Sequence, residues 1–289
     1  GNGTSPAADT NYVITATGSS GETATGFANG AIYNPYTDTQ NATNRNLLYD
    51  LVPCTGSTVG TCSAVNATGG TVAGTYTTTE AGGQRFFAIA LRAKPTTNVS
   101  IAISSSNTLE GTVSPASLTF TTANFNTLQV VTITGVNDSV ADGNIAYNIN
   151  FGAMTGNPAF TTTIPSLTAT NTDNDTVGFI LTNATDTGIL ESALGRSFTV
   201  RLNSQPTANV SIPLSVSAAT LPDTGLTITS TNPLVFTTAN WNTPQTVSFT
   251  WTGDGVGLPA TRNHTVILGT ATSADASYAI NPPDYTISI

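Results

Sequence analysis

The chain has 289 residues, of which 38% are hydrophobic and only 8% are charged. Thr makes up about a fifth of it, and Thr, Ser and Asn suit strands and turns, whereas helix surfaces rely on Glu, Lys and Arg. Sixteen acidic residues against seven basic ones give a net charge of −9, which disfavours binding to nucleic acid and to anionic membrane. This composition predicts an all-β protein.

Residues 1–72 form the first expected part of the chain. The segments 11–17 and 46–52 read as strands, and we interpret 1–72 as an additional β-rich N-terminal element. The longest apolar run, 86–91, is far shorter than the roughly 20 residues of a membrane span, so we expect no membrane insertion by the chain as given. Since no basic segment followed by an apolar one opens the chain, we expect any export signal to have been removed.

Two cysteines, Cys54 and Cys62, lie eight residues apart in a stretch rich in Gly, Thr and Ser. The spacing closes a hairpin-sized loop, and a zinc site would need two further ligands, whereas the single histidine, His264, lies in another part of the chain. We predict a disulfide; a pair of free buried thiols is the alternative, which so polar a loop disfavours. A disulfide implies an oxidising, extracellular or cell-surface location.

An internal repeat organises the rest of the chain. The segment 95–104 recurs at 206–215, and Glu80 and Arg85 recur as Glu191 and Arg196, all at an offset of 111 residues. The block 118–133 recurs at 234–249 with an offset of 116, which indicates a five-residue insertion around 221–225. Because such a period suits a complete sandwich domain, we predict two tandem immunoglobulin-like β-sandwiches, at 73–175 and 176–289.

Each repeat contains a corner with the pattern Phe-Thr-Thr-Ala-Asn-(Phe/Trp)-Asn, at 120–126 and 236–242. We expect Phe125 and Trp241 to cover the end of their sandwiches; a surface ring for ligand stacking is the alternative. Upstream of the first corner, large apolar residues alternate with small or polar ones at 87–91 and 99–103, which places the large side chains on one face of each expected strand.

The segments 131–138, 139–147 and 171–175 of the first repeat resemble a Calx-beta domain, in the Thr- and Asn-rich form that is strung in tandem through bacterial secreted and cell-surface proteins. The resemblance covers residues 73–289. It implies an immunoglobulin-like sandwich that gathers calcium at one end, with the ligands Glu80, Asp138, Asp142, Asp173 and Asp175.

Two departures from the family pattern bear on this calcium site, because Asn137 and Asn174 stand where carboxylates are expected and lower the charge. Calcium takes six to eight oxygen ligands, which the first repeat can supply. The alternative is that these Asp and Asn side chains only cap turns. In the second repeat Glu191, Asp223 and Asp254 remain, but Asp142 has no acidic counterpart, and we expect that site to be lost.

The sequence favours a non-enzymatic protein. A hydrolytic triad needs a base, and His264 aligns with Tyr147 in a predicted strand. We expect an extracellular structural or adhesive surface protein whose partners are copies of itself or other surface proteins. The alternative is a carbohydrate-binding or accessory module of a secreted enzyme. Asn98-Val-Ser100 is one of several glycosylation sequons that so Thr- and Asn-rich a chain contains.

A difference between the repeats suggests assembly into a fibre. The second repeat opens with an apolar strand at 176–181, whereas the first has only the polar, glycine-rich 65–70 at the 111-residue offset. If the first repeat lacks that strand, a donor can complete its sheet, and Tyr12, Val13 and Ile14 are the candidate donors. The alternative is that 1–72 is an independent small domain.

Overall fold

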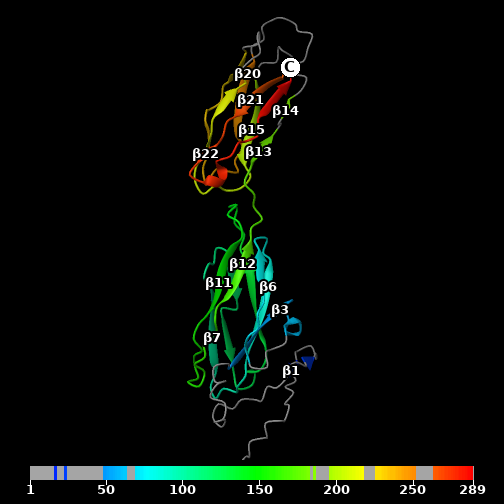
Figure 1. The fold of residues 1–289 in the computed structure, drawn as a ribbon, viewed down its shortest axis with the longest axis vertical. Coiled ribbons are helices and arrows are strands. Elements are labelled where there is room, and N and C mark those ends of the chain that lie inside the picture. Colours follow the sequence, from blue (N-terminus) through cyan, green and yellow to red (C-terminus); the bar gives the residue numbers. More distant parts are fainter. Residues whose placement is uncertain are drawn as a thin grey trace, which may run out of the picture. The chain divides into compact units, whose positions relative to one another are not determined.

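The computed structural model describes residues 48–63, 69–182, 195–217, 225–250 and 263–287, and the backbone alone of 16–17, 23–24, 185–186, 251 and 288. In these parts the chain is almost entirely β, as the sequence predicts, and it forms two compact units (Figure 1). The helical elements described are the short 3₁₀ helices η1 (Val59–Thr61) and η2 (Ala276–Tyr278). No described helix is long and apolar enough to cross a membrane.

The first unit is a sandwich of two five-stranded sheets. In spatial order, one sheet contains β4 (Gly70–Thr71), β3 (Tyr49–Cys54), β6 (Gln84–Leu91), β10 (Gln129–Gly135) and β8 (Gly111–Ser114). The other contains β5 (Tyr76–Thr79), β12 (Leu167–Thr172), β11 (Ile145–Phe151), β7 (Val99–Ser105) and β9 (Ser117–Phe120). A two-stranded ribbon, β1 (Ala16–Thr17) with β2 (Thr23–Ala24), precedes them.

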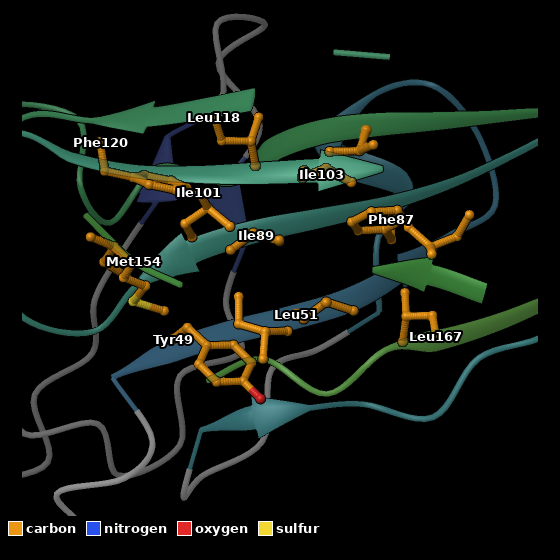
Figure 2. Packing of buried hydrophobic residues seen from close by; sticks show 14 of the residues in the cluster. Tyr49, Leu51, Phe87, Ile89, Ile101, Ile103, Leu118, Phe120, Met154 and Leu167 are labelled. Atoms are coloured by element: carbon orange, nitrogen blue, oxygen red, sulfur yellow. The ribbon is translucent and has the colours of Figure 1, made fainter. Parts of the chain in front are cut away.

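The core of this sandwich lies between the two sheets. Strand alternation turns Phe87 and Ile89 of β6 toward Ile101 of β7, and all three are fully buried. Figure 2 shows these side chains meeting between the layers, with Leu51 of β3 beside them. Burial of these apolar side chains, at about 25 cal/mol per Å², is the main force that holds the sheets together.

Strand β3 corrects the sequence-based division at residue 72. Tyr49–Cys54 does not belong to a separate element, because β3 pairs antiparallel with β6 inside the first sandwich, Tyr49 opposite Leu91. Strand β13 (Phe179–Thr182) pairs with β15 (Arg196–Leu202) in the same way, Phe179 opposite Leu202. The first repeat therefore does have the strand that the sequence comparison failed to find, and the expectation of an empty strand position is wrong.

The strand was missed because of an insertion. Residues 55–75 separate β3 from β5, whereas only residues 183–184 separate β13 from β14 (Thr185–Asp186). The counterparts Tyr49 and Phe179 are therefore 130 residues apart, from 49 to 179, and not 111. The insertion contains the disulfide loop and β4, which pairs in parallel with the outer edge of β3.

The second unit contains three sheets and its own core. The first sheet is β13, β15, β20 (Gln245–Trp251) and β18 (Leu226–Ile228), and the second is β14, β23 (Tyr285–Ser288), β21 (Asn263–Leu268) and β17 (Leu214–Val216). The third is β19 (Leu234–Phe236), β16 (Val210–Ile212) and β22 (Thr272–Ser273). Pro213, which stands where the first repeat has Ala102, separates β16 from β17, since proline cannot donate to a strand ladder.

Candidate functional site

The acidic residues of the first repeat lie where strands end. Glu80 follows β5, and Asp173 and Asp175 follow β12. Strands β5 and β12 are parallel and in register, Thr79 beside Thr172, so their carboxyl ends meet at one edge of the sheet. The Glu80 backbone N–H donates to the Thr172 carbonyl oxygen at 3.2 Å and continues this pairing. The topology thereby brings together carboxylates that are more than 90 residues apart.

Glu80, Asp173 and Asp175 form the first acidic group. One carboxylate oxygen from each lies within 4.8 Å of the other two, and Glu80 is only 2% exposed. The Asn174 backbone N–H donates to Glu80 Oε2 at 3.2 Å and helps to fix that side chain. Three convergent carboxylates, one of them buried, are a suitable ligand set for a hard cation such as calcium.

Glu110, Asp138 and Asp142 form the second acidic group, again with ligand atoms within 4.8 Å of one another. Strands β8 and β10 position it, because Gly111 pairs with Gly135 and the Val136 N–H donates to the Glu110 carbonyl oxygen at 3.0 Å. Glu110 is 6% exposed, whereas Asp142 is at the surface.

The sequence grouped Asp138 and Asp142 with the other three acids, whereas the structure separates the five into two groups and adds Glu110. Sequence reasoning missed Glu110 because the repeat comparison gives it no acidic counterpart. Leu226 pairs with Trp251 where Gly111 pairs with Gly135, so Gly225 occupies the place of Glu110 in the second sandwich. A carboxylate in an otherwise uncharged turn, directly before a strand, was the available signal.

The asparagines of this region do cap and connect turns, as the alternative interpretation expected. Asn174 Nδ2 donates to Asn137 Oδ1 at 3.1 Å, and Asn144 Oδ1 accepts from the Asp173 N–H at 3.1 Å. Asn137 Nδ2 donates to the Asp138 carbonyl oxygen at 2.6 Å. These amides hold the loops that carry the acids, so turn capping and convergence of the carboxylates occur together.

A buried amide lies behind the second acidic group. Asn171 of β12 is 1% exposed, and its Nδ2 donates to Glu110 Oε2 at 3.3 Å and to the Val136 carbonyl oxygen at 2.8 Å. Burial raises the pKa of the neighbouring Tyr147, the hydrogen bond with Thr78 lowers this pKa, and the Glu110 carboxylate raises it further. The net shift of this pKa is upward.

The aromatic corner residues cover the cores. Phe125 is partly buried against the first core and Trp241 against the second. Trp241 is therefore not a freely displayed ring for sugar stacking. His264 of β21 is 6% exposed and sits in a strand, where Tyr147 sits in the first repeat.

The remaining predicted residues divide into two sets. Cys54 and Cys62 are joined by a disulfide. The proposed donors Tyr12, Val13 and Ile14, and the acids Glu191, Asp223 and Asp254, lie outside the described residues.

No protein-family model matches the chain, and no curated protein matches it. Solved structures that resemble it include CBD12 from CALX1.2 and the calcium binding domain CBD12 of CALX1.1, each 18% identical over 70% of this chain and 79% and 80% of theirs, with TM-scores of 0.34 and 0.33. The Pseudomonas aeruginosa CupB2 chaperone is 12% identical over 75% of this chain and 96% of its own, with a TM-score of 0.26. Similarity this weak carries no information about function.

Proposed function

We propose that this chain is a non-enzymatic structural or adhesive protein of the cell exterior, built of tandem β-sandwiches, the first of which binds calcium. The observation that carries the proposal is the construction of the two units: the same repeat forms each of them around a separate core. Tandem domains of this kind suit a role as spacers or as surfaces that bind other molecules. The disulfide between Cys54 and Cys62 is consistent with the oxidising environment outside the cell.

The outer face of the first sandwich supports a role in contact rather than in chemistry. The strands β5, β12, β11, β7 and β9 contain no charged residue. Their outward positions are occupied by Thr, Ser, Asn and Ala, for example Thr168 and Asn148. Because the whole chain has a net charge of −9, this uncharged sheet face is where other surface molecules can bind without charge repulsion.

Assembly by strand donation is not part of this proposal. The edge of β6 that a donor would complete is occupied by β3 of the same chain, and β3 in turn pairs with β4.

Electron microscopy of source cells labelled with an antibody to this chain tests the location and the role. We expect label outside the cell, on a surface layer, fibre or matrix. Label confined to the cell interior contradicts the proposal. Saturable binding of the purified protein to one polysaccharide in a panel would favour the carbohydrate-binding alternative instead.

Thermal unfolding tests the calcium part. Millimolar calcium is expected to raise the melting temperature of the first sandwich, because a ligand that binds only the folded state stabilises it by mass action. Asp173→Asn should abolish the shift if the Glu80 group holds the ion, whereas Asp142→Asn should preserve it. Identical scans in chelator and in calcium would contradict calcium binding.

A further inference from the structure

A threonine hydroxyl and an asparagine side chain meet in the core of the first sandwich. Thr78 of β5 and Asn171 of β12 are direct neighbours in the parallel register of their strands. They are 0% and 1% exposed, respectively. Thr78 Oγ1 lies 3.2 Å from Asn171 Oδ1 and 3.2 Å from the Thr170 carbonyl oxygen. A hydroxyl nucleophile is thus held against an amide in a site that excludes water.

The surroundings fix the orientation of this amide. Both N–H bonds of Asn171 are engaged, by Glu110 Oε2 at 3.3 Å and by the Val136 carbonyl oxygen at 2.8 Å, so Oδ1 must face Thr78. Tyr147 Oη lies 3.5 Å from Thr78 Oγ1 and closes the site. A buried carboxylate therefore touches the nitrogen that would leave in an attack by the hydroxyl.

We propose that Thr78 and Asn171 react to form an intramolecular ester. Thr78 Oγ1 attacks Asn171 Cγ, an Oγ1–Cγ bond forms, and the Cγ–Nδ2 bond breaks. The hydroxyl proton ends on the departing nitrogen, where the Glu110 carboxylate, which already accepts a hydrogen bond from Nδ2, is placed to assist the proton transfer. The nitrogen leaves as ammonia. Atoms and charge balance, and no oxidant or other reactant is required.

The position of the bond suits a protein that bears load. It links β5 with β12 and closes a loop between residues 93 apart in sequence, which spans most of the sandwich. A covalent closure of that length strongly restricts the unfolded chain. Burial also protects the ester, because hydrolysis needs water that this core excludes.

Two glycines leave room for the side chains of Tyr147 and Asn171. A Cβ on Gly111 would lie against the Tyr147 hydroxyl, and a Cβ on Gly135 would lie against Asn171 Oδ1 and the Thr79 carbonyl oxygen, each closer than real Cβ contacts occur. The second sandwich keeps none of this arrangement in its described part, with Gly225 in place of Glu110 and His264 in place of Tyr147. The second sandwich is therefore a control within the same molecule, in which no such ester is expected.

Intact mass of the purified, reduced full chain is the first test. The ester predicts a mass about 17 Da below that of the sequence, since one ammonia is lost. Thr78→Val removes the nucleophile at nearly constant volume, and Glu110→Gln removes the carboxylate that assists the proton transfer; both are expected to restore the full mass. If either variant does not fold, the wild-type measurements below still decide.

Tryptic digestion of the denatured wild type locates the bond. Thr78 lies in the peptide 46–85 and Asn171 in the peptide 93–196, because Lys94 is followed by proline and resists cleavage. The proposal predicts one joined species of these two peptides, which hydroxylamine separates. Two unlinked peptides would overturn it: at full mass no bond has formed, and at a loss of 17 Da the modification is a succinimide within one peptide.

Discussion

Asp50 is a carboxylate that the fold buries on the side of β3 facing away from the core. It alternates with the core residues Tyr49 and Leu51, yet it is only 2% exposed. Burial raises its pKa from 3.8 to about 6, although Arg92, with Nη1 at 3.6 Å from Asp50 Oδ1, acts in the opposite direction. Desolvation therefore outweighs the ion pair at this position.

This raised pKa predicts how stability depends on pH. Because folding favours the protonated form, the contribution of Asp50 is most favourable below about pH 4 and is lost as the pH rises through about 6. Asp50→Asn mimics the protonated state. The variant should match the wild type at pH 3 and be more stable by about 1–3 kcal/mol at pH 8, measured by denaturant unfolding. A difference that does not change with pH would contradict this assignment.

At the scale of elements, the same corner is built twice. Asn124 Oδ1 accepts from the Thr121 N–H at 2.6 Å, and Asn240 Oδ1 accepts from the Thr237 N–H at 2.6 Å. In each corner the threonine hydroxyl also donates to the asparagine oxygen, at 3.0 and 3.1 Å. The identical hydrogen bonds explain why this segment is the most similar part of the two repeats.

Removing that acceptor is expected to destabilise each sandwich separately. Asn124→Ala leaves a partly buried N–H without its partner, which costs about 1–2 kcal/mol in the unfolding of the first sandwich. Asn240→Ala should have the same effect on the second. The exposed neighbour Thr122→Ala is the control and should change little. The prediction fails if Asn124→Ala lowers the free energy of unfolding of the first sandwich no more than Thr122→Ala does.

The disulfide loop is an element of the first sandwich only. Cys54 ends β3 and bonds to Cys62, closing a loop of eight residues. The chain-entropy model assigns such a loop about 2.5 kcal/mol of stabilisation. Reduction, or the double replacement of both cysteines by serine, should lower the stability of the first sandwich by about this amount and leave the second unchanged. Equal shifts in both transitions would contradict it.

At the scale of the whole molecule, two separate cores predict two unfolding transitions. The first core already includes Leu51 of β3, which is fully buried. Deleting residues 1–17 should therefore leave both transitions and the assembly state unchanged, as measured by calorimetry and light scattering. Leu51→Asp is the contrasting variant, because it places a charge in the core and should unfold the first sandwich. If the truncated chain has a less stable first sandwich, the result would instead support strand donation by residues 12–14.

The sequence by itself determined the all-β class, the tandem sandwiches, the inward-facing residues and the disulfide. These depend on local information, namely composition, alternation along a strand, a repeated motif and a single pair of cysteines. Phe87 and Ile89 point inward because successive side chains of a strand alternate between its faces, whatever the strand pairs with. The position of Glu80 near Asp173 and Asp175 was implied by family resemblance and placed by the parallel register of β5 and β12.

Only the tertiary structure decided which strand completes the first sandwich and how the acidic residues are divided between two groups. β3 pairs with β6 across the insertion at 55–75, and the length of an insertion hides the register from any comparison at a fixed offset. Glu110 joins Asp138 because β8 lies beside β10, and Asn171 meets Thr78 because β12 lies beside β5. Such contacts between distant residues depend on strand pairing, which alternation along one strand does not specify.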